Sequence, residues 1–367
     1  MKKLLIITPG YLPLLGGMEQ QTQLLASEFT NRGYQVTVLT EQTQPEFPEQ
    51  EKDGNIEIIR LKTSRSRSVA YLLLFFQLGL FLLRYGNSLK FIIVRTLTYP
   101  AIVVGLFKYL NILSIPTLAT AETGGEQDDV QAIAHYPFAS ILVKLLSAHT
   151  YLNALCEDNT NHFVEIGIPK NKVTFIPNGI ETSSSIRFNY PARVKSFLFI
   201  GQIASEKGIW ELLHAFKKLL IEFPKAKLYI AGVGPASEKL VEFIDNNNLK
   251  DGIEYLGRIP QTKLDWFFDK GECLVLPSYS EAMPLVILEA IARKKLVLCT
   301  DVGNIREMLG NQAYYCEIRD TNCLFKQMKA IFKTDSISLE YSNIIEKIDI
   351  KRTASLFLEK LTDQNRS

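Results

Sequence analysis

Two short loops in the second half of the chain carry the residues best suited to chemistry. The first runs from Gly201 to Gly208 after an apolar run and places Lys207 at the predicted start of a helix. A cation is unfavourable there because the positive end of the helix dipole repels it. A bound anion such as a phosphate would remove this cost. The alternative interpretation is a solvated surface lysine.

The second loop follows another apolar run and leads to two glutamates, Glu281 and Glu289, with seven residues between them. Pro284 suits the first turn of a helix, and the free backbone N–H groups at such a helix start can bind a phosphate. Glu289 lies among apolar residues, where a carboxylate is costly unless it has a partner. Sugar hydroxyls are suitable partners. A buried salt bridge is the alternative.

A pair of glycines, Gly16 and Gly17, lies between the first apolar run and an amphipathic stretch. Glycine lets backbone N–H groups approach an anion closely, and the helix dipole favours the negative charge. The glycines therefore form a second candidate anion site. An ordinary strand-to-helix turn would explain the same residues.

All three loops lie between predicted strands and helices that alternate along the chain. Apolar runs of about five to seven residues alternate with longer amphipathic stretches, which predicts parallel sheets covered by helices on both faces. The first series of predicted strands is 3–8, 35–40, 56–61, 91–96, 116–120, 150–155 and 173–177, and the second is 197–201, 227–232, 253–257, 272–277, 296–300 and 314–317. A polar linker is expected near 180–195.

We therefore predict an α/β fold of two Rossmann-like, doubly wound domains that face each other across a cleft, with the ligand at the carboxyl ends of the strands. The first domain is predicted over residues 1–185, and a C-terminal helix at about 351–367 returns to it. The second domain is predicted over residues 193–350.

Length and composition support this prediction and exclude other classes. The 367 residues suffice for two domains, and a composition with 47% hydrophobic residues is too apolar for disorder. A formal net charge of +2 argues against a nucleic-acid binder that relies on bulk charge. The five cysteines form no C-x-x-C pair, which favours buried, reduced thiols and a reducing compartment. The N-terminal apolar run is interpreted as a buried strand rather than a secretory signal.

Taken together, the motifs resemble those of the retaining glycosyltransferases with the GT-B fold, of the group 1 or family 4 type. The pair Glu281 and Glu289 is similar to the E-x7-E signature of that family. Further segments occur in the family's order and spacing, namely 176–180, 201–208, 231–235, 256–257 and 276–278. The resemblance covers nearly the whole chain and is strongest from residue 176 to residue 309.

The resemblance implies transfer of a sugar from a nucleotide-diphosphate sugar, with retention at the anomeric carbon and without a metal or cofactor. Lys207 would neutralise the departing diphosphate, Glu281 would contact the donor sugar, and Glu289 would bind the ribose. The implied donor-binding set also contains Gly16, Gly17, Gln202, Ala282, Met283, Pro284 and Leu285. Fixed donors would thus stabilise the leaving group electrostatically, and the carboxylate-spacing rules of glycosidases do not apply.

The chain departs from the family pattern at two positions. Gln202 stands where the family commonly has Arg, so about 1 kcal/mol or more of charge-assisted binding would be missing. Glu122 stands in a loop where many relatives have His. We include Glu122 among the predicted catalytic residues, as a contact to donor or acceptor. The alternative is that it caps a turn.

One long segment of the first domain has a one-sided charge. Between Ile58 and Ala121 the chain has no Asp or Glu, where about seven would be expected from the average, and it has eight Lys or Arg. The apolar run Val69–Leu83 within it, about fifteen residues long, is shorter than the ~20 that cross a bilayer. Such a segment can lie among the headgroups of an anionic membrane. We expect peripheral membrane contact through about 60–110. A buried helix flanked by solvated cations is the alternative.

The sequence thus predicts a cytoplasmic, metal-independent hexosyltransferase, with a place at the inner face of the cell membrane if that contact forms. Its donor would be a nucleotide sugar, and its acceptor a glycan or lipid-linked glycan in surface polysaccharide or glycolipid biosynthesis. No nucleic-acid partner is expected. A non-catalytic nucleotide-sugar-binding protein, which Gln202 would suit, is one alternative. A nucleotide-sugar 2-epimerase is another, although the E-x7-E pattern argues against it.

Overall fold

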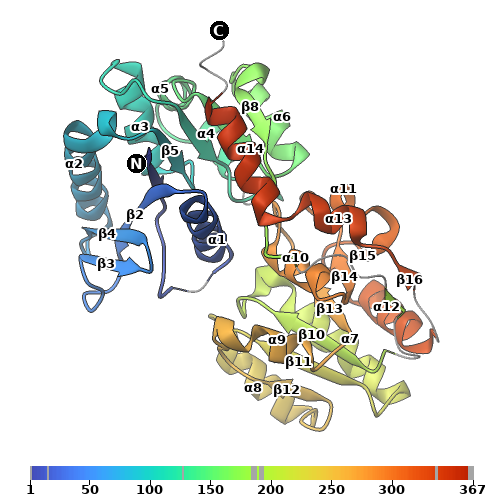
Figure 1. Cartoon of the computed structure of the whole chain (residues 1–367). Helices are drawn as coiled ribbons and strands as arrows, with labels where there is room; N and C mark the ends of the chain where they lie inside the picture. Colours follow the sequence, from blue (N-terminus) through green and yellow to red (C-terminus); the bar gives the residue numbers. More distant parts are fainter. Residues whose placement is uncertain are drawn as a thin grey trace. The chain divides into compact units, whose positions relative to one another are not determined.

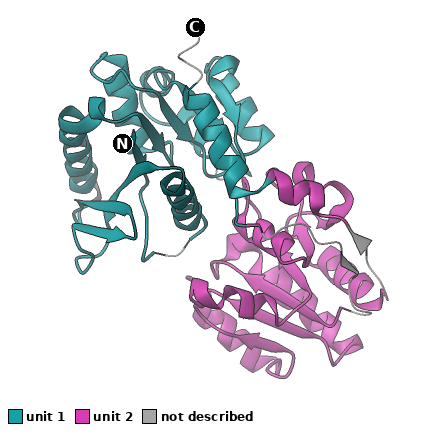
Figure 2. Ribbon diagram, viewed as in Figure 1, with its two compact units in different colours: residues 1–181, 348–367 teal, residues 182–347 magenta. Residues whose placement is uncertain are grey.

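The computed structural model divides the chain into two compact units (Figure 2). Unit 1 comprises residues 1–181 and 348–367, and unit 2 comprises residues 182–347. Within this chain the structure describes residues 2–14, 16–125, 128–182, 188–189, 194–334 and 338–362. Most of the linker predicted near 180–195, as well as Leu15 and Glu126 of the motif loops, lies outside the described residues.

Unit 1 is built on an eight-stranded sheet with the order β3-β4-β2-β1-β5-β6-β7-β8 (Figure 1). All neighbouring strands are parallel except the β3–β4 hairpin. The strands are β1 (Lys2–Ile7), β2 (Tyr34–Gln42), β3 (Gln50–Asp53), β4 (Ile56–Lys62), β5 (Phe91–Val94), β6 (Thr117–Thr120), β7 (Tyr151–Ala154) and β8 (Val173–Phe175). The N-terminal run is therefore a central buried strand, as predicted.

Helices cover both faces of this sheet. On one face, α1 (Gly17–Asn31) and α14 (Ile350–Thr362) share a hydrophobic core with the strands. A second core contains buried residues of α2 (Arg67–Tyr85), α3 (Tyr99–Tyr109), α4 (Asp129–Ala134), α5 (Ala139–Leu146) and α6 (Glu157–Glu165). The right-handed crossovers of a doubly wound sheet place these five helices on the opposite face.

Unit 2 has a six-stranded, fully parallel sheet with the order β12-β11-β10-β13-β14-β15. The strands are β10 (Ser196–Ile200), β11 (Lys227–Ala231), β12 (Ile253–Tyr255), β13 (Cys273–Leu276), β14 (Leu296–Thr300) and β15 (Tyr314–Cys316). The helices are α7 (Ile209–Glu222), α8 (Ser237–Asn246), α9 (Leu264–Phe268), α10 (Leu285–Ala292), α11 (Ile305–Leu309), α12 (Thr321–Lys333) and α13 (Ser342–Lys347). This strand order is that of a dinucleotide-binding fold, and it reverses between β10 and β13.

Two features of the fold differ from the sequence analysis. The polar strand β3 was not predicted, because Gln50–Asp53 has no apolar alternation and is recruited only by its hairpin with β4. The prediction of reduced thiols is wrong for one pair, since Cys316 and Cys323 form a disulfide with a Cα–Cα distance of 5.6 Å. The end of β15 and the first turn of α12 bring these two residues together. The other three cysteines are free and buried.

One glycine of unit 1 makes a testable contribution to stability. A Cβ atom on Gly105 of α3 would collide with the backbone carbonyl of Leu145 in α5, whereas one on Gly79 of α2 would lie 3.6 Å from the ring of Phe107. We expect Gly105→Ala to destabilise the protein by about 1–3 kcal/mol, because backbone must move. Gly79→Ala should be neutral or stabilise by up to about 1 kcal/mol. Urea unfolding followed by circular dichroism tests this, and equal effects of the two substitutions would contradict it.

Candidate functional site

The carboxyl edge of the unit 2 sheet brings two of the predicted residues together. Lys207 lies in the loop that follows β10, and Glu281 lies in the loop that follows β13, the strands on either side of the point where the strand order reverses. The Nζ of Lys207 is 2.7 Å from Oε1 of Glu281. The two side chains keep 27% and 15% of their surface exposed, so the ion pair is partly buried and accessible from solvent.

Glycines allow these two loops to pack backbone against backbone. Gly208, which has φ +67°, could not carry a Cβ atom without colliding with the carbonyl of Pro277. The backbone N–H of Tyr279 donates to the carbonyl of Glu206 over 2.9 Å. On the other side, Gly303 packs against the carbonyl of Glu281 in the same close manner. The Glu281 loop is therefore held from both sides, and its backbone stays close to the loop that carries Lys207.

Helix α10 starts in the same loop. It begins at Leu285 after Pro284, and no side chain caps its first turn. Ala282, Met283 and Leu285 are buried at this start, with 3%, 6% and 6% of their surface exposed. Backbone N–H groups are therefore the polar groups that this turn offers to an anion.

Glu289 lies one turn further along α10 and is only 6% exposed. Its helical neighbours Leu288, Ala290 and Ile291 are fully buried. The structure thus places Glu289 on the element that follows the Glu281 loop, as the sequence analysis predicted for the E-x7-E pair.

The charge of Lys207 has a resident partner that the sequence analysis did not name. A bound anion was expected to relieve the repulsion between this lysine and the start of α7, and Glu281 supplies such a negative charge within the protein. A phosphate that reached Lys207 would therefore share the ammonium with Glu281, because lysine has three N–H donors. Gln202, in the same loop, is exposed.

The first turn of α1 in unit 1 carries the other predicted anion site. Gly16 is the N-terminal cap residue of α1, and both Gly16 and Gly17 are exposed. The carboxylate of Glu19 lies directly against Gly16 and Gly10, in the space that a side chain on either glycine would fill. An acidic residue thus occupies the positive end of this helix, where its charge is favourable.

Glu122 follows β6 in unit 1 and binds a buried arginine. The Nη2 of Arg95, which follows β5, donates to Oε2 of Glu122 over 3.1 Å, and the Nε of Arg95 lies 2.8 Å from Oε1 as an ion pair. Arg95 also donates to Oδ1 of Asn178 over 3.3 Å. Burial raises the pKa of Glu122, and Arg95 acts in the opposite direction. One hydrogen bond and one close ion-pair contact thus hold the Glu122 carboxylate against Arg95.

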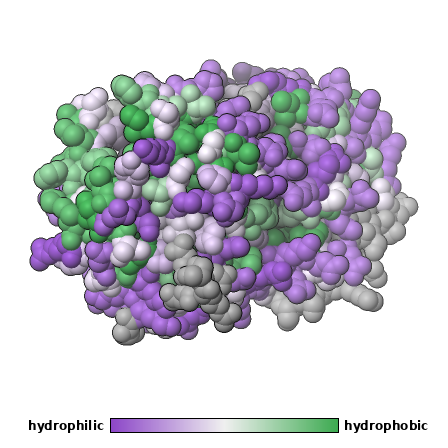
Figure 3. Space-filling view, turned by 90° about the horizontal axis from the view of Figure 1, so that it is seen from above, coloured by the Kyte–Doolittle hydropathy of each residue, from purple (hydrophilic) through white to green (hydrophobic). Residues whose placement is uncertain are grey.

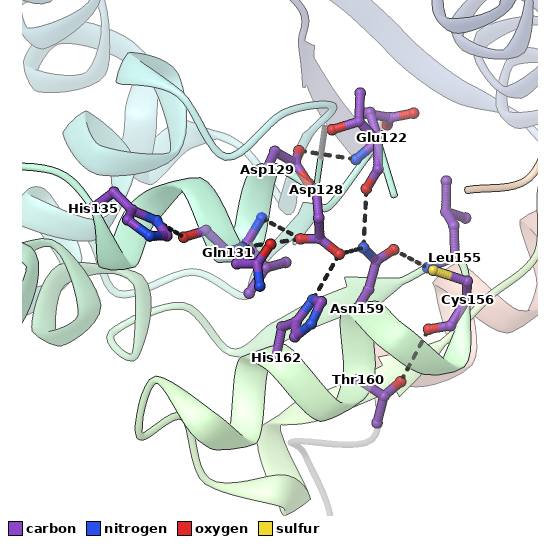
Figure 4. Close-up of polar contacts among 12 residues, drawn as sticks. Glu122, Asp128, Asp129, Gln131, His135, Leu155, Cys156, Asn159, Thr160 and His162 are labelled. Atoms are coloured by element: carbon purple, nitrogen blue, oxygen red, sulfur yellow. Dashed lines mark hydrogen bonds and ion pairs between the residues drawn. The ribbon is translucent and has the colours of Figure 1, made fainter. Parts of the chain in front are cut away.

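A polar network holds the loop that contains Glu122 (Figure 4). The Oδ1 atom of Asp128 caps helix α4, and its Oδ2 atom accepts from Asn159 over 2.8 Å and contacts Nδ1 of His162 at 2.9 Å. The backbone N–H of Glu122 donates to Oδ2 of Asp129 over 3.0 Å. Sequence reasoning missed this network. The available signal was an aspartate at a helix start, which is typical of an N-cap. In the described part of the chain no group of three His, Cys, Asp or Glu is arranged to hold a metal ion.

Because two loops of unit 2 pack backbone against backbone, we expect alanine to lower the stability by different amounts at two of its glycines. Gly208 and Gly257 both have positive φ, +67° and +62°, but a Cβ atom meets backbone only at Gly208. Gly257→Ala should cost about 1–2 kcal/mol through φ alone, and Gly208→Ala about 1–3 kcal/mol more through the clash. Urea unfolding followed by tryptophan fluorescence reports on unit 2, because Trp210 and Trp266 both lie there. Equal losses of stability in the two variants would contradict the close packing of Gly208 against Pro277.

The carboxyl group of Asp129 predicts a pH-dependent stability. Burial raises its pKa to about 8, whereas the unfolded chain ionises near 4. The folded protein keeps a proton that the unfolded chain releases, so the stability contribution of Asp129 falls as the pH rises from about 4 to about 8. Asp129→Asn should therefore reduce the loss of stability between about pH 4 and about pH 8 by on the order of 1–3 kcal/mol. Unfolding at about pH 5 and about pH 8 measures it, with the exposed Asp245→Asn as control. If both variants keep the wild-type loss, Asp129 is not the cause.

Comparison with known families and proteins shows what the chain is similar to. Residues 15–184 match the family described as "Glycosyltransferase Family 4", and residues 184–346 match "Glycosyl transferases group 1". The chain is 33% identical over 136 residues to the putative teichuronic acid biosynthesis glycosyltransferase TuaC of Bacillus subtilis, a match that covers 36% of this chain and 32% of that protein. It is 24% identical over 243 residues to the glycogen synthase of Mycobacterium tuberculosis, with 64% and 57% covered. The matched segments thus span about a third to just over a half of these relatives' own length.

Solved structures match the chain over its whole length. Sucrose-phosphate synthase from Thermosynechococcus elongatus superposes with a TM-score of 0.76 at 17% identity and covers 100% of this chain and 99% of its own. Anabaena HepE in complex with UDP and glucose gives a TM-score of 0.74 at 14% identity, with 99% and 100% covered. These likenesses confirm the predicted fold class. Together with the two family matches, they show that the chain belongs to the glycosyltransferases of the GT-B fold.

Proposed function

We propose that this protein is a retaining glycosyltransferase that transfers a hexose-type sugar from a nucleotide-diphosphate sugar to a glycan acceptor. The observation that carries the proposal is the ion pair of Lys207 with Glu281 at the strand-order reversal of unit 2. In a doubly wound sheet this is the place where a nucleotide binds. The nearby start of α10 adds backbone donors for a diphosphate.

In this proposal, different residues of unit 2 bind different parts of the donor. As the bond from the sugar to the diphosphate breaks, negative charge grows on the leaving oxygen, and Lys207 with the N–H groups of 282–285 stabilises it. Glu281 accepts hydrogen bonds from sugar hydroxyls and keeps Lys207 in place. Glu289 accepts hydrogen bonds from the ribose. No metal takes part, so activity should persist in excess chelator.

Proteins of the same fold support a nucleotide-sugar donor. Anabaena HepE has been solved in complex with UDP and with UDP-glucose, and the trehalose-6-phosphate enzyme of Escherichia coli was solved with UDP-2-fluoro glucose. These complexes are properties of those proteins. They support a uridine diphosphate sugar as the first donor to test for this chain.

In unit 1 the proposal gives Gly16 and Gly17 a diphosphate contact and Glu122 a contact to donor or acceptor. The Glu19 carboxylate beside Gly16, which is half-buried, would then have to rotate away. The proposed acceptor is a lipid-linked glycan of surface polysaccharide or glycolipid biosynthesis. The enzyme would reach it from the cytoplasm, by peripheral contact with an anionic membrane through about 60–110.

Replacing Lys207 tests the central role. Lys207→Met should lower kcat by about 100-fold to 1,000-fold, because one preorganised stabilising group is lost. The folded state should lose no more than about 1 kcal/mol, since the ion pair is partly exposed. Lys217→Met is the matched control, because Lys217 is an exposed lysine of α7 whose Nζ bonds Asn247 over 2.6 Å. Sugar release from labelled UDP-, GDP- and ADP-sugars gives the rate. Equal rates for the two variants would sink the proposal.

The products separate this activity from the alternatives. Retention predicts that the new linkage has the anomeric configuration of the donor, which nuclear magnetic resonance reads directly. A non-catalytic binding protein would show a thermal shift with a nucleotide sugar but no sugar release. A 2-epimerase would return a sugar with altered stereochemistry at C2 and no glycoside.

A further inference from the structure

Helix α2 of unit 1 turns an apolar stripe toward solvent. Successive turns expose Val69, Leu72, Phe76, Leu80 and Leu83, which keep 52%, 73%, 63%, 50% and 61% of their surface accessible. A surface helix of a soluble domain normally carries polar residues on this face. The exposed stripe is therefore a feature that folding of unit 1 alone does not explain.

The opposite stripe of the same helix is packed in the core. Leu74, Leu78 and Leu82 are at most 2% exposed and belong to the cluster that includes α3 and the sheet. The sequence analysis judged the run Val69–Leu83 too short to cross a bilayer, but the helical segment Ser68–Ser88 has 21 residues and is, by length and composition, long and apolar enough to do so. It would have to leave this core to cross a membrane. A helix with one stripe packed and the other free can instead lie flat in a membrane surface.

Two further groups of apolar side chains extend the same layer of helices. The end of α3 exposes Tyr109 and Leu110. The turn between α4 and α5 exposes Tyr136 and Phe138, the latter at 77%, and the first turn of α5 exposes Ile141. Helix α3 packs against both α2 and α5. In the space-filling view, hydrophobic residues gather over this part of unit 1 (Figure 3). The sequence analysis had named only the 60–110 segment.

The charged residues on and around these helices indicate which kind of partner the apolar surface fits. Helices α2, α3 and α5 contain no Asp or Glu, and none occurs between Val130 and Cys156. Arg65 and Arg84, at the two ends of the stripe, are exposed, and Lys144 lies 4.8 Å from the ring of Tyr109. Two of the eight cations counted earlier do not contribute, because Arg60 and Arg95 are buried in ion pairs. Apolar stripes bordered by cations and tyrosines fit an anionic lipid surface.

We propose that the apolar stripe of α2, with the exposed ends of α3 and the α4–α5 turn, inserts into the surface of an anionic bilayer while α2 stays packed on unit 1. This deepens the membrane contact named above, yet binding of vesicles does not depend on catalysis. The competing explanation is that a second copy of the chain covers the apolar stripe. Pairing two such faces would bring their exposed arginines into the same apolar interface, which is unfavourable.

The test is co-flotation of the full chain with vesicles that contain phosphatidylserine, compared with vesicles of phosphatidylcholine alone. We expect Leu72→Glu/Phe76→Glu to lower the bound fraction at least 10-fold, because both side chains lie on the exposed stripe. Ile221→Glu is the matched control, since Ile221 of α7 in unit 2 is 78% exposed. Lys207→Met should bind like the wild type, so loss of activity and loss of binding are read separately.

Four results would overturn the proposal. They are no flotation of the wild type at low salt, unchanged flotation of the double variant, equal loss in the Ile221→Glu control, and bound protein that resists extraction by alkaline carbonate. The last result would mean that α2 crosses the bilayer. Analytical ultracentrifugation without lipid completes the test, because a dimer that the double variant abolishes, in a protein that does not float, would assign the stripe to a second copy.

Discussion

The candidate site depends on the close backbone packing of two loops in unit 2. Because Gly208 lies against Pro277 and Gly303 lies against Glu281, the loops after β10 and β13 cannot move independently. Lys207 and Glu281, at the carboxyl edge, are consequently within reach of each other, and their side chains form an ion pair. A fixed cation is useful to a reaction in which negative charge develops on a leaving group, since no reorganisation is needed when the charge appears.

The pairing of Lys207 with Glu281 also changes how the loop is understood. An unpaired lysine at the start of α7 would be repelled by the helix dipole, and Glu281 offsets that repulsion in the free protein. A diphosphate would enter a site whose cation is already oriented. It would have to share that cation with the nearby carboxylate of Glu281. The ion pair would thus orient Lys207 in advance, but it would also compete with the diphosphate for the ammonium group. In the proposed function, the neutral side chain of Gln202 would leave binding of the diphosphate to Lys207 and to the backbone N–H groups at the start of α10.

Much of the fold could be predicted because buried parallel strands leave a clear signal in the sequence. Uninterrupted apolar runs such as Leu4–Ile7 and Leu274–Leu276 can only be satisfied in the middle of a sheet covered on both faces. The loop motifs then followed from their place after such runs. Polar elements gave no such signal, and strand β3, with the sequence Gln-Glu-Lys-Asp, exists only through its partner β4.

Contacts between distant segments were the part that sequence reasoning could not supply. The binding of Glu122 by Arg95 needs the neighbouring positions of β5 and β6, and the Cys316–Cys323 disulfide needs the turn between β15 and α12. The charge count of residues 58–121 suggested a cationic surface, although Arg60 and Arg95 are buried with acidic partners. Similarly, the apolar run of α2 did not reveal which of its faces the fold would cover.

Lysine-selective acylation of the folded protein, with and without a nucleoside diphosphate, tests the role of Lys207 most directly. Peptide mapping then gives the labelling rate of each lysine. The account predicts that the nucleotide slows labelling of Lys207 and leaves that of the exposed Lys217 unchanged. Equal labelling of Lys207 with and without a nucleotide that demonstrably binds would contradict it, because the diphosphate would then bind elsewhere.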